Sequence, residues 1–491
     1  MRRSFSRPVA LGVIAGVCIA IGSYGAGATR YRGGVMRALG LEPLTYGHGR
    51  ALMDITLTIG ILALVFAWVW VGRARVADMR RVTWAWAAPI AFSAPILSRD
   101  VYSYLMQGAM LRDGFDPYSQ GAASNPGPFL WEVSHDWRNT TTPYGPLHLG
   151  LGKAVTTVVG DNVTAGVVAY KLLALIGFAI IVWAVPRLAE SAGGDPQLAL
   201  WLGAANPVML LHLVGGMHNE AIMVGLVSVG LLACVRWRQF TLGIALIAVA
   251  VSLKATAAVA LSFVVWMMVG PGRRPGRFVA CGAWAVAVTG AVLQLVTWLS
   301  GSTWGWVAEI TGNSKVINPL AGPTFAAEVL TPLLPWEYNQ VLAASRTVFS
   351  LAMLAGLVAV WWTFRPRGGE YGEYAARGLA GTTAAYTVAF ATNAVTLPWY
   401  YASILSLAGT FRPPRWVIDV TVGASIVVAL AFTGGGNHRL YDLWFLALAS
   451  FAAVAAVKWI RTPSPARDES LPGPSGRAAR PQDAPATSRP R

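Results

Sequence analysis

The sequence predicts an all-α, polytopic membrane protein, and two observations carry this prediction. Hydrophobic residues make up 55% of the 491 residues and charged residues only 12%, about half the roughly 25% of soluble domains. In addition, apolar runs close to the roughly 20 residues that span a bilayer recur along the whole chain. Because a bilayer must then be the main solvent, the formal net charge of +16 is a topology signal, and we expect no nucleic acid among the partners.

Apolar runs divide most of the chain. They lie near residues 8–28, 51–71, 83–97, 164–186, 197–213, 219–235, 240–253, 255–270, 277–299, 346–363, 377–394, 399–411, 416–433 and 441–460. Several are too short to cross a full-thickness bilayer upright, so we expect tilted or broken helices among them. Residues 1–460 are thus predicted to form a single integral-membrane domain with about 12–14 membrane-embedded helices.

The position of the arginines predicts the orientation. Positively charged short loops face the cytoplasm, and arginines fill alternating loops at 73–81, 236–238, 273–277 and 365–367. The same alternation puts the long segments 98–163 and 300–345 on the periplasmic side of a cytoplasmic membrane.

Some parts of the chain fit less regularly. Residues 29–50 fall on the outer side although they carry four arginines. The stretch 240–270 has to cross twice, with a turn at Lys254; one long tilted helix with a snorkelling lysine is the alternative. The first run resembles a cleaved signal peptide, but an uncleaved span is expected. Residues 461–491, rich in Pro, Ser, Ala and Arg, are expected to be a disordered cytoplasmic tail.

Cofactor chemistry has no clear signature. The three cysteines lie inside apolar runs, where a thiol behaves as a small hydrophobe. The six histidines lack metal-ligand spacing, and neither a phosphate-binding glycine loop nor a nucleophile elbow occurs. We therefore predict no cofactor and no metal site, and the sequence leaves divalent-metal dependence open.

Polar and aromatic residues concentrate in the segment that follows the third run. The candidates there are Arg99, Asp100, Tyr102, Tyr104, Asp116, Tyr118 and Tyr144. Aromatic faces pack on sugar rings and carboxylates accept hydroxyl hydrogen bonds, so the segment is typical of a sugar site. The alternatives are an interfacial ion pair of Arg99 with Asp100, an aromatic belt, and a structured loop that binds a periplasmic partner.

Four later groups add to this set. They are His218, Asn219 and Glu220; Lys254; Trp399, Tyr400 and Tyr401; and Arg439. Ionisable groups at membrane depth by default mark a cavity or a pathway, with helix packing as the alternative for His218. Lys254, a lone cation in an apolar stretch, suits a lipid phosphate, and Arg439 is a second candidate for that role. The aromatic group follows a helix-breaking proline and indicates a substrate cavity or a plain aromatic belt.

At these residues the chain resembles a known family. The motifs are SRDVYSYLMQGAMLRDGFDPY at 98–118, PYGP at 143–146, GGMHNE at 215–220, SLKATA at 252–257 and LPWYY at 397–401. They resemble the actinobacterial polyprenyl-phosphomannose-dependent α-(1→6)-mannosyltransferases that build the mannan core of lipomannan and lipoarabinomannan, over roughly residues 45–460. The resemblance implies the GT-C glycosyltransferase architecture, with Asp100 as the acidic residue of the first periplasmic loop.

The resemblance also implies a reaction. Mannose would move from polyprenyl-phosphomannose to the 6-hydroxyl of a mannosylated glycolipid acceptor, with inversion and on the periplasmic face. Asp100 would be the general base, with Glu220 as its rival, and Lys254 or Arg439 would hold the leaving phosphate, with Arg99 in reserve. Three alternatives stay open: a transferase for another polyprenyl-linked sugar such as arabinofuranose, a lipid-linked saccharide transporter or flippase, and a scaffold for envelope assembly.

Overall fold

The computed structural model describes residues 6–272, 274–312 and 317–462. Within these ranges the chain is built from helices, and the only β-type pairing is an isolated bridge between Phe432 and His438. The predicted all-α class is therefore confirmed. Most of the predicted tail, 463–491, lies outside the described residues.

The first half of the chain contains α1 (Arg7–Ala26), α2 (Val35–Ala38), α3 (Gly47–Ala74), α4 (Met79–Ala91), α5 (Asp100–Arg112), α6 (Pro128–Glu132), α7 (Pro146–Val159), α8 (Val163–Ser191), α9 (Pro196–Leu202), the π-helix η4 (Met209–Gly215), α10 (Glu220–Trp237), α11 (Phe240–Val251), the short 3-10 helix η5 (Ala255–Ala258) and α12 (Val259–Val269). The second half contains α13 (Pro275–Ser300), α14 (Trp306–Gly312), α15 (Gly322–Leu330), α16 (Tyr338–Thr363), α17 (Tyr371–Thr392), the 3-10 helix η8 (Pro398–Tyr401), α18 (Ala402–Ala408), α19 (Arg415–Leu430) and α20 (Leu443–Arg461).

Seven of the described helices are long and apolar enough to cross a membrane: α1, α3, α8, α10, α13, α16 and α20. The shorter predicted runs form shorter or broken helices. The run 197–213 is divided between α9 and η4, and the run 399–411 between η8 and α18. One contiguous cluster of buried apolar side chains extends from Val9 to Ala453. The protein is therefore a polytopic helical membrane protein.

The stretch 240–270 is interrupted, as the alternation of charged loops predicted. α11 ends at Val251 and α12 begins at Val259, with Lys254 in the turn between them. The alternative of one long tilted helix is wrong.

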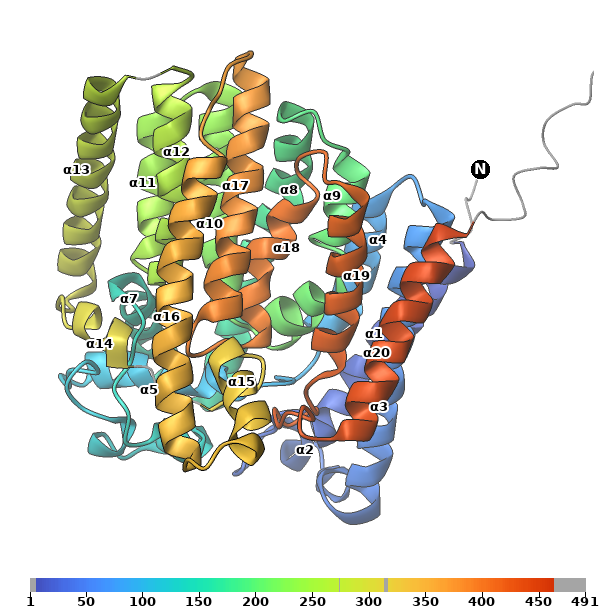
Figure 1. Ribbon diagram of the computed structural model, residues 1–491. Coiled ribbons are helices and arrows are strands. Elements are labelled where there is room, and N and C mark those ends of the chain that lie inside the picture. The colour runs from blue at the N-terminus through green and yellow to red at the C-terminus, as the bar shows by residue number, and fades with distance from the viewer. Residues whose placement is uncertain (1–5, 273, 313–316, 463–491) are drawn as a thin grey trace, which may run out of the picture.

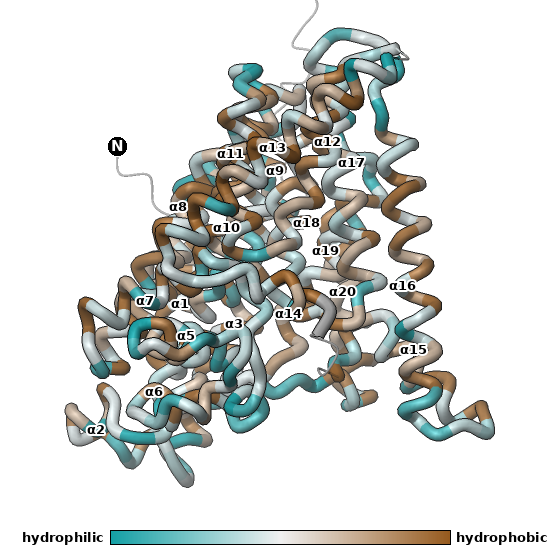
Figure 2. Tube along the Cα trace, turned by 90° about the vertical axis from the view of Figure 1, so that its left-hand side faces the viewer, coloured by the Kyte–Doolittle hydropathy of each residue, from teal (hydrophilic) through white to brown (hydrophobic). Residues whose placement is uncertain are grey.

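The two ends of the helix bundle differ in character. In Figure 1 the helices of segments 29–50, 98–163 and 300–345, among them α2, α5 and α15, gather at the lower end, whereas the α12–α13 and α16–α17 connections lie at the opposite end. Hydrophilic residues are frequent around α2, α5 and α6, while hydrophobic residues dominate the long helices (Figure 2). This arrangement agrees with the predicted alternation of loops.

A buried carboxylate explains part of the misfit of segment 29–50. Glu132 is 1% exposed and forms ion pairs with Arg30 and Arg99, each at 3.4 Å. Its two carboxylate oxygens also accept hydrogen bonds from the backbone N–H groups of Tyr31 and Arg32, at 2.6 and 3.2 Å. One arginine of this segment, Arg30, is therefore paired with a carboxylate of segment 98–163, which offsets its positive charge at this end of the molecule.

Labelling from one side of the membrane tests the orientation. In a background without the three native cysteines, a cysteine at Ser119 should react with a membrane-impermeant maleimide in intact cells. A cysteine at Glu370, in the exposed α16–α17 connection, should react only after the membrane is opened, because arginine-rich loops stay in the cytoplasm. The reverse pattern would overturn the orientation.

Candidate active site

The segment before α5 places Asp100 at the start of that helix. The backbone N–H of Asp100 donates to the Ser98 hydroxyl at 3.1 Å, and the hydroxyl of Tyr104, one turn later, lies 3.5 Å from Asp100 Oδ2. The Asp100 side chain keeps 19% of its surface exposed. Asp100 is thus held by local contacts while one face of the carboxylate stays open.

The GGMHNE motif forms a tight turn between η4 and α10. Met217 adopts a left-handed conformation, with φ at 57°, which is uncommon for a residue other than glycine. A Cβ on Gly216 would lie 2.9 Å from the His218 ring, so this glycine allows the ring to fold back. His218 Nδ1 then lies 3.6 Å from Asp100 Oδ2, and its ring stacks on Trp399 at 3.6 Å between centroids.

The PYGP and SLKATA motifs bond to each other through their backbones. The N–H groups of Gly145 and Leu147 donate to the carbonyl groups of Leu253 and Ser252, at 3.1 and 2.8 Å. A Cβ on Gly145 would lie 2.3 Å from the Ser252 oxygen, so only glycine permits this approach. The contact brings the turn at Lys254 to the aromatic residues before α7.

Lys254 forms a buried ion pair with Glu220. The two side chains are 10% and 1% exposed, and Lys254 Nζ also lies 3.6 Å above the ring of Tyr400 and 5.8 Å above that of Tyr144. The interpretation of Lys254 as a lone cation is therefore wrong. The sequence shows only the apolar neighbours of Lys254 along the chain, whereas its partner comes from a different helix.

Nine of the predicted site residues form one cluster: Asp100, Tyr104, Tyr144, His218, Asn219, Glu220, Lys254, Trp399 and Tyr400. Each of the five motifs contributes to it. We refer to these nine residues as the polar cluster. Because its members come from segments far apart in sequence, only the fold brings them together.

The other predicted site residues lie elsewhere. Arg99 donates to the carbonyl groups of Glu132 and Thr29, and Tyr102 donates to the carbonyl group of Ala28. Both therefore face the N-terminal segment. Among the described residues, neither Tyr401 nor Arg439 forms an ion pair or a side-chain hydrogen bond with the polar cluster.

Asp116 and Tyr118 form a local turn. The carboxylate of Asp116 accepts hydrogen bonds from the backbone N–H of Tyr118 and the hydroxyl of Ser119, at 3.0 and 3.1 Å. This arrangement is an Asx turn, a common local structure, and the Tyr118 side chain is buried. The pair organises the loop at some remove from the polar cluster.

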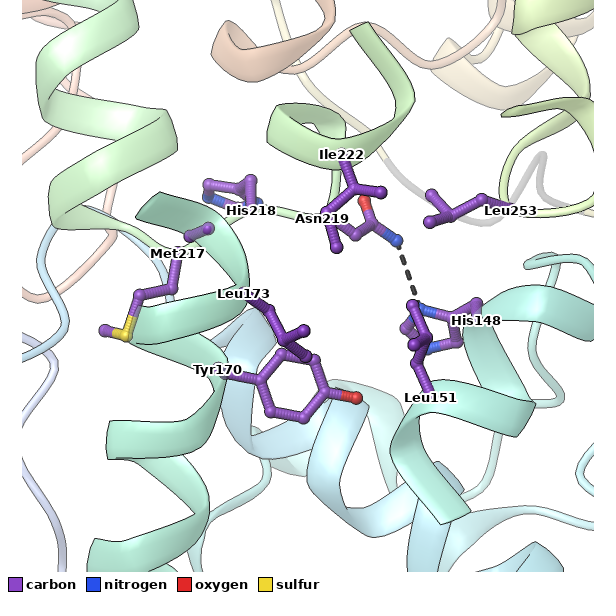
Figure 3. Close-up of a pocket in the computed structure, with 10 residues that line it drawn as sticks. His148, Leu151, Tyr170, Leu173, Met217, His218, Asn219, Ile222 and Leu253 are labelled. Carbon is purple, nitrogen blue, oxygen red and sulfur yellow. Dashed lines mark hydrogen bonds between the residues drawn. The ribbon is translucent and has the colours of Figure 1, made fainter. Parts of the chain in front are cut away.

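Two residues that support the cluster, His148 and Gln107, were not predicted from the sequence. His148 on α7 accepts a hydrogen bond at Nδ1 from the Asn219 amide, at 3.2 Å (Figure 3). Its Nε2 lies 2.9 Å from Gln107 Oε1. Burial lowers the pKa of His148 to about 3, with a smaller contribution from Lys254, so the imidazole is neutral and suited to this relay. The partners come from three helices, and nothing in the local sequence signals their contact.

A small cavity of about 10 Å³ lies beside the cluster, and its lining includes His148, Tyr170, Met217, His218 and Asn219. Figure 3 shows these residues. The amide nitrogen of Asn219 points across the cavity toward His148. Apolar side chains such as Leu173 and Ile222 close the rest of its wall. The hydrogen bond from Asn219 to His148 is therefore a polar contact in a largely apolar surrounding.

The electrostatics of Asp100 distinguish it from an ordinary surface acid. Burial, together with the negative charge of Glu220, raises the pKa of Asp100 to about 6, while hydrogen bonding by Ser98 and the charge of Lys254 act in the opposite direction. A carboxylate with a pKa near neutrality is a more effective proton acceptor than a normal aspartate. The described residues contain no group of three or more His, Cys, Asp or Glu side chains arranged to hold a metal ion.

The fold and the cluster define a class: a multi-pass helical membrane protein with a partly exposed carboxylate, an ion pair and aromatic rings near one end of the bundle. Two family models match the chain, "Alpha-(1->6)-mannopyranosyltransferase, N-terminal domain" over residues 9–270 and "MptB C-terminal domain" over residues 320–462. The chain belongs to the alpha-(1→6)-mannopyranosyltransferase family.

Curated relatives agree with this assignment. The chain is 52% identical to alpha-(1→6)-mannopyranosyltransferase A of Corynebacterium glutamicum, over 90% of this chain and 95% of the relative. It is 36% identical to alpha-(1→6)-mannopyranosyltransferase A of Mycobacterium tuberculosis, over 91% and 89%. It is also 29% identical to a probable alpha-(1→6)-mannopyranosyltransferase of Mycolicibacterium smegmatis, over 96% and 93%.

The buried ion pair makes a stability prediction. Lys254→Met should destabilise the protein by about 3–5 kcal/mol, because it leaves Glu220 buried without a partner. The double variant Lys254→Met with Glu220→Met should recover most of this loss, because no unpaired charge remains. Thermal unfolding in detergent micelles measures both effects. A single variant as stable as the wild type would show that the pair does not compensate for the burial of Glu220.

Proposed function

We propose that this protein transfers mannose from polyprenyl-phosphomannose to the 6-hydroxyl of an α-mannoside on a glycolipid acceptor. The product would be the α-(1→6)-linked mannan core of lipomannan and lipoarabinomannan, made at the periplasmic face of the cytoplasmic membrane by a GT-C enzyme. The observation that carries the proposal is the convergence of all five family motifs on the polar cluster around Asp100. Family membership and the activity named for the relatives give further support.

Two carboxylates are candidates for the general base, and their surroundings favour Asp100. Glu220 is 1% exposed and forms the ion pair with Lys254, so an acceptor hydroxyl has little access to its carboxylate. Asp100 is 19% exposed, and burial together with the charge of Glu220 raises its pKa. An acceptor hydroxyl therefore has better access to Asp100.

The proposed step is a single displacement. The acceptor 6-oxygen attacks the anomeric carbon of the donor while the bond from that carbon to the phosphate oxygen breaks. Asp100 takes the hydroxyl proton, and polyprenyl phosphate leaves with the electron pair of the broken bond. One displacement inverts the anomeric centre, which converts a β-linked donor into an α-linked product.

Cations would stabilise the leaving phosphate. Charge develops on the phosphate as the bond breaks, and a positioned cation lowers the barrier by stabilising it. Lys254 in the cluster is the proposed ligand, and Arg439 in the α19–α20 connection, outside the cluster, is the second candidate. Arg99 is the weakest candidate, because its guanidinium group is bound to Glu132 and Thr29. Because phosphate is already a stabilised leaving group, the proposal requires neither a second acid nor an obligatory metal ion.

Paired substitutions test the roles of the two carboxylates. Asp100→Asn keeps the size of the side chain but removes its basicity, so turnover with saturating substrates should fall by about 10²–10⁴-fold while donor binding survives. Glu220→Gln should impair donor binding more than turnover. Asp136→Asn, an exposed acid of the same loop, is the matched control. The base would have to be reassigned if Asp100→Asn turned over normally and Glu220→Gln bound donor without reaction.

The pH profile supplies an independent test. A base must be deprotonated to act, so kcat/KM should be constant above the pKa of Asp100 and fall about tenfold per pH unit below about 6. An unperturbed aspartate would place this break near pH 3.9. In Glu220→Gln the break should move to lower pH, because a neighbouring negative charge is removed. A wild-type profile flat down to about pH 4.5 would contradict the assignment.

A further inference from the structure

A second buried lysine lies outside the polar cluster. Lys171 belongs to the membrane-spanning helix α8 and is 7% exposed. Among the described residues no carboxylate lies within ion-pair distance of its Nζ. A lysine buried at membrane depth is costly unless its ammonium group is hydrogen-bonded, so the contacts around Lys171 have to compensate for lost water.

These contacts join two distant segments of the chain. Lys171 Nζ donates to the carbonyl group of Val214 at 2.9 Å, to the hydroxyl of Ser93 at 3.2 Å and to the carbonyl group of Gly215 at 3.5 Å. Val214 and Gly215 end the π-helix η4, and the last carbonyl groups of a helix lack partners within it and carry the negative end of its dipole. Ser93 lies in the connection from α4 to α5.

Both segments, the connection from α4 to α5 and the turn after η4, contain a strained residue just before a member of the polar cluster. Leu97, with φ at 62°, precedes Asp100, and Met217, with φ at 57°, precedes His218. Left-handed conformations of residues other than glycine are strained and persist only where surrounding contacts hold them in place. The bonds of Lys171 are contacts of this kind for both turns at once.

The two segments also touch each other beside the lysine. The backbone N–H of Ile96 donates to the carbonyl group of Gly215 at 3.4 Å, the same carbonyl group that faces Lys171 Nζ. This bond is long, so on its own it fixes the spacing of the segments weakly. The ammonium group of Lys171 adds hydrogen bonds to both segments, to Ser93 in one and to Val214 in the other.

We propose that Lys171 is a positioning residue that holds these two segments together, so that Asp100 and His218 face each other at 3.6 Å. Lys171 has no hydrogen bond or ion pair to either side chain and acts through the backbone that carries them. The catalytic consequence rests on the proposed function, whereas the structural consequence does not. A misplacement of about 1 Å can cost about 10²-fold in rate, which sets the expected size of the effect.

The kinetic test removes the ammonium group and keeps the length of the side chain. Lys171→Met should lower kcat by about 10²-fold and shift the acid break of the pH profile, because the surroundings of Asp100 change, while KM for the donor changes little. Lys171→Arg, which keeps a cationic donor, should recover part of kcat. Lys458→Met, on the membrane-spanning helix α20, is the matched control and should behave like the wild type. Ser93→Ala, which keeps the lysine and both carbonyl acceptors, should give a smaller loss in the same direction and serves if Lys171→Met does not fold.

Hydrogen exchange measured by mass spectrometry decides the inference without activity. Lys171→Met should accelerate exchange in residues 94–104 and 214–220 and leave α12 unchanged, because only the two joined segments lose a contact. Unchanged exchange in both segments would overturn the proposal. So would a general acceleration with normal kcat per folded molecule, since Lys171 would then only stabilise the fold. If the wild type transfers no mannose from polyprenyl-phosphomannose, the proposed function fails, and the exchange data still decide the role of Lys171.

Discussion

The buried ion pair between Lys254 and Glu220 is the interaction on which the polar cluster depends. A buried pair gains little net stability over apolar packing, but either charge alone would be strongly destabilising. The pair therefore ties the start of α10 to the turn between α11 and α12: neither side chain can leave without exposing the other to an apolar interior. Its cation–π contact extends the tie to Tyr400 on η8. The ion pair thus adds little net stability but fixes the relative positions of the segments that it joins.

This constraint separates the roles open to the two carboxylates. Glu220 is paired with Lys254 and almost fully buried, whereas Asp100 has a partly exposed carboxylate whose polar neighbours include Tyr104 and His218. The negative charge of Glu220 in turn contributes to the raised pKa of Asp100. Two acids close in space therefore differ in access and in basicity, a familiar way for a site to assign different tasks to like groups.

The helical framework was predictable from sequence because it depends on composition and period alone. The turn at Lys254 was predictable for a related reason, since charged loops on both sides of 240–270 require two crossings. The partners of the charges were not predictable. From the sequence, Lys254 has no visible partner, but in the structure it pairs with Glu220 of another helix. Likewise, Arg99 is adjacent to Asp100 in sequence, but its guanidinium group binds Glu132 near the N-terminal segment. Pairings between distant segments are properties of the fold, and local sequence carries little trace of them.

The contacts of Lys171 could not be predicted from the sequence either. It sits inside a long apolar run, where a single lysine reads as an incidental charge, and its acceptors are mostly backbone carbonyl groups, which no residue type reveals. The two backbone acceptors are the last carbonyl groups of the π-helix η4, just before Met217 adopts a left-handed conformation, and the sequence GGMHNE hints at this turn only through its glycines. In an apolar interior, a carbonyl group that has no hydrogen bond within its helix needs another donor. A buried ammonium group supplies such a donor, and the carbonyl groups in turn compensate for its lost hydration. At the turns before Asp100 and His218, Lys171 supplies such donors in addition to the backbone N–H group of Ile96.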